Sequence, residues 1–307
     1  MARVFLCREL PFPALDRLSS QHDVDIWEER TPPPPDAFLA RAQQADALLT
    51  TVTDKVDGAF LDQAPSVKAI ANLAVGTDNI DLEAAKQRGI PVGNTPGVLT
   101  DATADIAFAL LLAVARRIVE GDREVREDRW APWHPSHMLG GDLADQTLGI
   151  IGWGRIGQAM ARRGEGFGMR VVHHSRSSGI PLDELLETSD YVSLHTPLTP
   201  ETRHLMGAEQ FARMKPTAYF VNTSRGGTVD QVALREALEN GEIAGAGLDV
   251  TDPEPLPADD PLLSAPNLVV VPHVGSATVR TRSRMADLAV DNLLAALAGE
   301  EMPNRVA

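Results

Sequence analysis

Residues 148–157 read LGIIGWGRIG. Gly152, Gly154 and Gly157 have the spacing G-x-G-x-x-G between an apolar strand-like run and an alanine-rich helical run. The first glycine makes a tight turn, the second lets the backbone approach a pyrophosphate, and the third lets the helix pack on the strand. The positive end of the helix then faces the phosphates. The stretch predicts dinucleotide binding, although a purely structural glycine-rich turn would read the same way.

Alternating strand-like and helix-like segments flank this unit on both sides. Five short β-like runs lie in residues 1–97, and a second alternation runs from Thr147 to Val271. Strands separated by helices of this length predict parallel sheets with right-handed crossovers. We therefore expect an α/β protein with two doubly wound parallel-sheet domains. The β-like runs are Val4–Cys7, Val24–Trp27, Ala47–Thr51, Lys68–Ala71, Pro91–Gly93, Leu148–Gly152, Arg170–His174, Tyr191–Leu194, Ala218–Asn222, Ala246–Asp249 and Leu268–Val271.

Two longer helices are expected outside the crossovers. Residues 98–129 predict one long helix whose middle, IAFALLLAVA, is apolar on all sides, which suits a buried domain spine or a subunit interface. The last helix, Ala277–Ala298, has one apolar face and is followed by Gly299. The longest apolar run, Ile106–Ala115, is too short to span a bilayer.

The composition is that of a globular protein and argues against several kinds of partner. The 307 residues are 43% hydrophobic and 23% charged, which suits one large domain or two ordinary ones. The net charge of −15 disfavours nucleic acid and anionic membranes, and an anionic substrate would need local cations. Cys7 is the single cysteine, so no intrachain disulfide forms. We expect a cytoplasmic protein without a signal peptide.

The segment after the strand RVVHH bears on the choice of dinucleotide. NAD sites place an Asp or Glu there for the ribose 2′-hydroxyl, whereas this chain has Ser175, Arg176 and Ser177. A guanidinium with hydroxyls suits a 2′-phosphate. We therefore expect a preference for NADP(H). NAD(H) remains the alternative if Arg176 is only a solvated surface residue.

Three segments that follow later strands carry residues able to catalyse a reduction. Ligands of open α/β sheets bind at such strand ends. Reduction of a 2-keto acid needs a cation for the carboxylate and carbonyl, a proton donor, and a carboxylate that orients the donor. Arg225, His273 and Glu254 supply one of each, and together they predict an oxidoreductase, although each alone has a structural explanation. The segments are NTSRGG (222–227), GLDVTDPEP (247–255) and PHVGSAT (272–278).

With these motifs, the chain resembles the D-2-hydroxyacid dehydrogenase family, and within it the glyoxylate reductase/hydroxypyruvate reductase group. The resemblance covers almost the whole chain and includes NLAVGTDNID (72–81), GNTPGVLTDATADIAFALLLAVAR (93–116) and WHPSHMLG (133–140). It implies that Arg225, Glu254 and His273 are catalytic. It places substrate contacts at Val75, Gly76, Arg225, His273, Ser276 and His137. It places cofactor contacts at Thr103, Gly152, Gly154, Arg155, Ile156, Gly157, Ser175, Arg176, Ser177, Thr196, Pro197, Thr202, Thr223, Ser224, Arg225, Asp249, His273 and Gly275.

The resemblance also implies a domain organisation. A Rossmann coenzyme domain, residues 98–277, would be inserted into a flavodoxin-like substrate domain formed by residues 1–97 and 278–307, with the active site in the cleft between them. Family members are typically homodimers joined through the long helix and the segment after it, so we expect a homodimer.

One residue departs from the pattern of close relatives. His137 stands where they usually carry a second Trp, which in the glyoxylate/hydroxypyruvate group reaches toward the partner subunit's substrate pocket. A smaller, polar residue there would favour a different substrate side chain, or His137 is a solvated interface residue. No metal site is expected, because the histidines lie in separate elements without ligand spacing. They are His134, His137, His173 and His174.

The activity implied by the resemblance is NADPH-dependent reduction of glyoxylate and hydroxypyruvate to D-2-hydroxy acids. In this hypothesis His273, as imidazolium, protonates the substrate oxygen and Glu254 holds the ring, so reduction slows as pH rises. Two alternatives stay open. One is a family enzyme with a phosphoglycerate, lactate-like or formate-like substrate. The other is a dinucleotide-sensing corepressor that keeps the same three residues, which an NADPH-consumption assay would distinguish.

Overall fold

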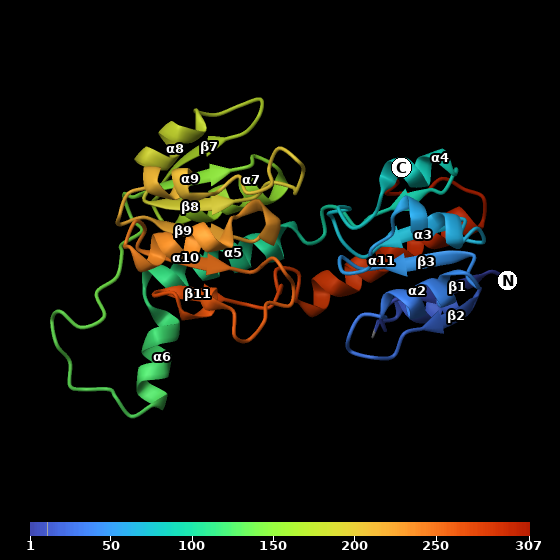
Figure 1. The fold of residues 1–307 in the computed structure, drawn as a ribbon, viewed down its shortest axis with the longest axis horizontal. Coiled ribbons are helices and arrows are strands. Elements are labelled where there is room, and N and C mark those ends of the chain that lie inside the picture. The colour runs from blue at the N-terminus through green and yellow to red at the C-terminus, as the bar shows by residue number, and fades with distance from the viewer. Residues whose placement is uncertain (11) are drawn as a thin grey trace. The chain divides into compact units, whose positions relative to one another are not determined.

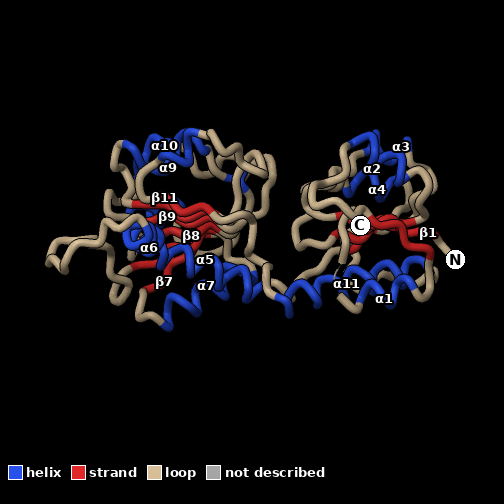
Figure 2. The backbone as a smooth tube through the Cα atoms, turned by 90° about the horizontal axis from the view of Figure 1, so that it is seen from below, coloured by secondary structure: helices blue, strands red, loops and turns tan. Residues whose placement is uncertain are grey.

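The computed structural model describes residues 1–10 and 12–307, which form two compact units. Unit 1 comprises Met1–Leu99 and Ala277–Ala307, and unit 2 comprises Thr100–Ser276. Each unit has one parallel sheet with helices on both faces (Figures 1 and 2). The predicted fold class, α/β with two parallel-sheet domains, is confirmed. Among the described residues, no helix is both long and apolar enough to cross a membrane.

The sheet of unit 1 has five parallel strands in the order β2-β1-β3-β4-β5. This is the flavodoxin-like order, in which the connections change direction between β1 and β3. The strands lie within one or two residues of the predicted runs, and β4 ends at Asn72. Their bounds are β1 Arg3–Leu6, β2 Asp23–Ile26, β3 Ala47–Thr50, β4 Ala69–Asn72 and β5 Val92–Gly93.

Side chains of alternate residues in these strands enter two different cores. Along β1, Phe5 packs in one core while Val4 and Leu6 pack in the other, as the period of two in a strand requires. The first core lies under α2 (Pro35–Ala42), α3 (Gly58–Gln63) and α4 (Leu82–Gln87), and the second lies under α1 (Ala14–Ser19) and α11 (Val279–Leu297) (Figure 2). The last helix of the chain therefore completes the unit that the first 99 residues begin.

The sheet of unit 2 has six parallel strands in the order β11-β10-β9-β8-β6-β7. Among the described strands, β7 is the edge strand on one side of the sheet. The Rossmann order 3-2-1-4-5-6 has one more strand beyond this position, and no described strand occupies it. The direction of winding changes between β6 and β8, where ligands of such sheets bind. The bounds are β6 Thr147–Ile151, β7 Arg170–His174, β8 Tyr191–Leu194, β9 Tyr219–Asn222, β10 Gly245–Leu248 and β11 Leu268–Val270.

Helices cover both faces of this second sheet (Figure 2). On one face lie α8 (Leu182–Thr188), α9 (Ala208–Arg213) and α10 (Gln231–Glu239), around a core that includes Phe211, Phe220 and Leu234. On the other lie α5 (Thr100–Ala115) and α7 (Arg155–Gly166). Two short 3-10 turns, η1 (Gly226–Thr228) and η2 (Pro261–Ser264), follow β9 and β10.

The prediction of one helix over residues 98–129 is wrong. The segment forms α5 and a separate α6 (Ile118–Arg126), broken at Arg117, whose φ is 52°. The carbonyl oxygen of Ala115 accepts a 2.9 Å hydrogen bond from the N–H of Gly141, and a side chain at Gly140 would meet that oxygen at 2.1 Å. Gly140 and Gly141 therefore pack against the end of α5, where the next helical turn would lie, and α5 ends there.

Candidate active site

The glycine-rich turn connects β6 to α7 at the place where the sheet of unit 2 changes direction. Gly152 has φ 99°, and a Cβ there would lie 2.5 Å from the carbonyl oxygen of His195. A Cβ on Gly157 would lie 2.1 Å from the carbonyl oxygen of Gly152. The protein's own packing therefore requires the first and third glycines, for the turn and for close helix–strand contact.

The middle glycine is different. A Cβ on Gly154 would meet nothing within 4 Å, and the residue is exposed at the N-cap of α7, where no side chain caps the helix. No contact with the described residues would exclude a side chain at position 154. The open space beside Gly154 therefore favours a ligand that approaches the backbone. The uncapped N–H groups of α7 suit an anion. This geometry fits the pyrophosphate of a dinucleotide.

The segment after β7 forms a tight serine turn. The Oγ of Ser175 accepts a 3.0 Å hydrogen bond from the N–H of Ser178, which leaves Arg176 and Ser177 exposed. Arg176 makes no hydrogen bond or ion pair within residues 1–10 and 12–307. Its charge contributes, after the hydroxyl of Thr199, to lowering the pKa of Glu201. The exposed guanidinium of Arg176, next to Ser175 and Ser177 in the chain, is suited to binding a phosphate group.

Two threonines at the ends of neighbouring strands have unpaired hydroxyls. Thr196 follows β8 and Thr223 follows β9, and each Oγ1 is buried without a hydrogen-bond partner among the described residues. Buried hydroxyls without partners are costly, which favours a role in binding a ligand. Thr202, by contrast, donates its hydroxyl to the carbonyl of Pro197 at 2.6 Å and so holds that loop.

An imidazole–carboxylate pair lies in the segments that follow β10 and β11. His273 Nδ1 and Glu254 Oε2 are 2.8 Å apart, and the Thr251 N–H donates to Glu254 Oε1 at 3.0 Å. About a third of the His273 side chain is exposed, 34%, compared with 27% for Glu254. One ring nitrogen is thus held by a fixed carboxylate, and Nε2 is left as the atom that can exchange a proton.

The charge state of Glu254 follows from its surroundings. Burial raises its pKa, but the hydrogen bond and charge of His273, the Thr251 N–H and the charge of Arg225 together outweigh burial. The pKa of Glu254 therefore lies below its usual value of 4.5. At neutral pH the residue is a carboxylate, as an orienting group for an imidazolium requires.

The loop that carries His273 is held by Asp249, at the end of β10. Its buried carboxylate accepts the N–H groups of Val274 at 2.6 Å and Gly275 at 2.8 Å, and its carbonyl accepts the His273 N–H at 2.9 Å. Burial raises the pKa of Asp249 despite these bonds. A Cβ on Gly275 would lie 2.9 Å from the Asp249 carboxylate and 3.3 Å from Thr103, so this predicted cofactor contact is also a close-packed position.

Arg225 lies at the start of η1, in a loop that is shaped by Asn222, a residue not predicted to belong to the site. Asn222 accepts from the N–H and Oγ of Ser224 at 2.9 and 2.7 Å and donates to the carbonyl of Arg225 at 2.9 Å. The guanidinium of Arg225 donates to the Ser224 carbonyl at 2.9 Å. An Asn directly after a strand favours such a side-chain-to-backbone turn, which was the available signal.

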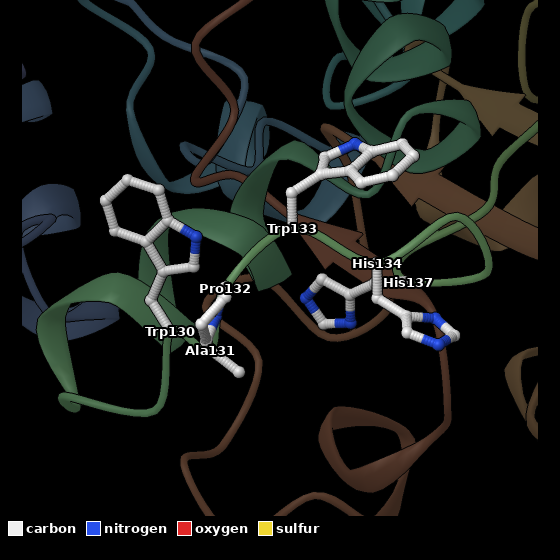
Figure 3. Close-up of a pocket in the computed structure, with 6 residues that line it drawn as sticks. All are labelled: Trp130, Ala131, Pro132, Trp133, His134 and His137. Carbon is white, nitrogen blue, oxygen red and sulfur yellow. The ribbon is translucent and has the colours of Figure 1, made fainter.

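The other residues predicted to contact the substrate lie in three separate segments of the chain. Ser276 is partly exposed at the end of unit 2, and Val75 and Gly76 are partly exposed in the loop after β4 of unit 1. His137 pairs with the buried Glu124 of α6, with 2.9 Å between Nε2 and Oε1. It also lines a surface pocket of about 370 Å³ (Figure 3). The pocket is formed by Trp130, Ala131, Pro132, Trp133, His134 and His137.

The histidines singled out in the sequence each have a different neighbour. Within the described part of the chain, no group of three or more His, Cys, Asp and Glu side chains could hold a metal ion. His134 pairs with Ser136, His137 with Glu124, His173 with Ser178 and His174 with the carbonyl of Ile180.

Comparisons with known proteins agree with this geometry. A family model described as D-isomer specific 2-hydroxyacid dehydrogenase, NAD binding domain, matches residues 108–275. A glyoxylate reductase from Korarchaeum cryptofilum is 51% identical and covers 99% of this chain and 95% of its own. A crystal structure of a Thermus thermophilus protein has a TM-score of 0.95 at 52% identity, covering 99% of this chain and all of that one. An NADPH-dependent glyoxylate/hydroxypyruvate reductase from Sinorhizobium meliloti, solved with NADP and malonate, has a TM-score of 0.86 at 35% identity, covering 100% and 97%.

The fold and the site define a dinucleotide-binding protein with a proton-transfer pair. The chain belongs to the D-isomer specific 2-hydroxyacid dehydrogenase family, which confirms the resemblance seen in the sequence. Its cofactor is accordingly a nicotinamide dinucleotide.

Proposed function

We propose that this protein reduces glyoxylate and hydroxypyruvate to the corresponding 2-hydroxy acids and prefers NADPH. The observation that carries the proposal is the His273–Glu254 pair, 2.8 Å apart, in the same unit as a glycine turn whose open position is Gly154. The names of the Korarchaeum and Sinorhizobium relatives support these two substrates. In this proposal unit 2 binds the coenzyme and unit 1 contributes to substrate binding.

Each residue has a separate task in the proposed reaction. The bound nicotinamide supplies a hydride to the keto carbon. The Nε2–H of His273 protonates the keto oxygen, because Glu254 accepts the hydrogen bond of the other ring nitrogen and so fixes the ring. Arg225 pairs with the carboxylate and polarises the carbonyl, and the N–H groups of Val75 and Gly76 bind the same carboxylate. Ser276 and His137 complete the proposed substrate contacts.

A kinetic panel tests both the substrate and the cofactor. We expect turnover of glyoxylate and hydroxypyruvate to exceed that of pyruvate and longer 2-keto acids, and kcat/KM to be higher with NADPH than with NADH. The Arg176→Ala variant should lower kcat/KM for NADPH about 10-fold or more and leave NADH nearly unchanged, because only NADPH carries the phosphate that Arg176 would pair with.

Arg170→Ala is the matched control, since Arg170 is also exposed and begins the strand that Arg176 follows. It should change neither cofactor's kinetics. Preference for NADH in the wild-type protein would contradict the cofactor assignment. Tight NADPH binding without turnover of any 2-keto acid would contradict the proposed enzymatic activity and favour the alternative of a dinucleotide-sensing corepressor.

We also propose that the protein is a homodimer joined through α6 and the segment that follows it. Trp130 and Trp133 are 72% and 85% exposed, and Figure 3 shows their rings apart from each other. Together with exposed Ile118, Val125 and Leu139, they present an apolar surface that suits a second copy.

Sedimentation velocity is expected to give a dimer for the wild-type protein. Trp133→Glu should shift it toward monomer, because an unpaired charge would be buried in the interface. Val232→Glu changes an equally apolar residue, 60% exposed on α10, and should remain dimeric. A wild-type monomer, or dissociation of both variants alike, would contradict the assigned interface.

A further inference from the structure

Three consecutive carbonyl groups in the loop after β4 are held by the interior of unit 1. The Ala74 carbonyl accepts the N–H of Thr95 at 2.8 Å, the Val75 carbonyl accepts Nδ2 of Asn94 at 2.8 Å, and the Gly76 carbonyl accepts Nδ2 of Asn72 at 2.9 Å. A loop at a strand end normally turns some carbonyls to water. Here every carbonyl of residues 74–76 is bound, which restricts how these peptide groups can rotate.

The N–H groups of the same residues are not used by the protein. Those of Val75 and Gly76 donate no hydrogen bond to any group in residues 1–10 and 12–307, and both residues are partly exposed. Successive peptide N–H groups that face outward from fixed peptides form a binding site for an anion. Each N–H shares a planar peptide group with the carbonyl of the residue before it. The Val75 N–H is therefore fixed through the Ala74 carbonyl, which the Thr95 N–H holds, and the Gly76 N–H through the Val75 carbonyl, which Asn94 holds. Asn72 fixes the peptide that follows, between Gly76 and Thr77.

Asn72 is itself fixed from several sides. It is fully buried at the end of β4, and its Oδ1 accepts the hydroxyl of Thr50 at 2.9 Å. Its Nδ2 also contacts Oδ1 of Asn79 at 3.0 Å, and Asn79 in turn donates to the carbonyl of Thr51 at 2.9 Å. The side-chain amide of Asn72 can therefore be neither rotated nor removed without breaking a buried network.

Asn94 is braced from the last helix. Asn292, fully buried in α11, donates to the Asn94 carbonyl at 3.0 Å and accepts the N–H of Asn304 at 2.9 Å. Gly93 makes room for it, because a Cβ there would lie 2.6 Å from the Asn292 side-chain amide. The end of the chain thus helps to fix the position of a side chain that holds the Val75 carbonyl.

We propose that Asn94 is a positioning residue: it holds the Val75 carbonyl inward so that the N–H of the same peptide group, that of Gly76, faces the substrate carboxylate beside the Val75 N–H, while Asn72 fixes the next peptide of the loop. This inference rests on the proposed reduction of 2-keto acids, in which those N–H groups bind the carboxylate. Because the carboxylate does not change during hydride transfer, Asn94 supports substrate binding equally in the ground state and the transition state. Its loss therefore raises KM and leaves kcat largely unchanged.

The test uses steady-state kinetics of Asn94→Ala and the nearly isosteric Asn94→Asp in the full-length protein. Both remove the donor to the Val75 carbonyl, so the KM for glyoxylate is expected to rise about 10- to 100-fold. The kcat and the Kd for NADPH should stay within about two-fold of wild type. Glycolaldehyde, which lacks the carboxylate, supplies the second readout: the preference for glyoxylate over glycolaldehyde should fall by the same factor as KM rises.

Ile70→Val, in the buried part of β4, is the matched control for a simple loss of stability. It should lower the melting temperature without changing the KM or the preference for glyoxylate. An unchanged KM in a folded Asn94→Asp protein, or an equal loss with glyoxylate and glycolaldehyde, would overturn the inference. Absence of glyoxylate turnover in the wild-type protein would instead count against the proposed function, so the two failures are distinguishable.

Discussion

Replacement of His273 with alanine is expected to lower kcat for glyoxylate reduction by about 10²- to 10⁴-fold, the usual contribution of a positioned proton donor. The ring is held at Nδ1 by Glu254, 2.8 Å away. Water would have to protonate the substrate oxygen in the variant. The Kd for NADPH, measured by fluorescence titration, should change far less than kcat because the glycine turn is unaffected.

The control for this variant is His204→Ala. His204 is exposed in the same unit and, like His273, has a positive φ, 50° compared with 51°. Alanine at such a position carries a similar backbone cost, so the control separates backbone strain from proton donation. It should keep wild-type kcat. A His273→Ala protein with near-normal reduction, or a comparable loss in His204→Ala, would refute the assignment of the proton donor.

Replacement of Glu254 with glutamine is expected to lower kcat by about 10²-fold at neutral pH and to remove the fall of kcat at low pH. Glutamine can still contact Nδ1 but carries no negative charge to hold the ring for proton donation. In the wild-type protein kcat should also fall at low pH as Glu254 is protonated, and this acid-side fall should be absent from the variant, which has no carboxyl group at that position.

The acid-side fall of the wild-type profile follows from the ionisation of Glu254. Because its pKa is lowered from 4.5, its contribution to stability is present above pH 4.5 and is lost as pH falls through the lowered pKa. The fall in kcat is therefore expected below pH 4.5. Asp252→Asn removes one negative charge nearby, from a side chain that is 49% exposed and pairs with Arg203, and should keep the wild-type pH profile. An acid-side fall that persists in Glu254→Gln would contradict the orienting role.

Much of the fold could be predicted from the sequence because its signals are local. Short β-like runs separated by helices predict parallel strands, and the observed strands lie within one or two residues of those runs. The spacing of Gly152 and Gly157 reflects contacts within the turn and with the adjacent strand, which any sequence of this fold must satisfy. The helix break at Arg117 could not be predicted, since it depends on Gly141, which lies far along the chain from the carbonyl that it takes.

The candidate site also has features that could be predicted from the sequence and features that depend on distant residues. The glycine-rich turn and the types of residue that a reduction needs could be predicted from sequence alone, because glycine, imidazole, guanidinium and carboxylate have few substitutes in those roles. Only the tertiary structure decided which atoms meet: Glu254 with Nδ1 of His273, and Asn292 with the carbonyl of Asn94 from 198 positions away. Long-range hydrogen bonds of this kind leave no periodicity or spacing in the chain, because each partner satisfies only its own local geometry until the sheet brings the segments together.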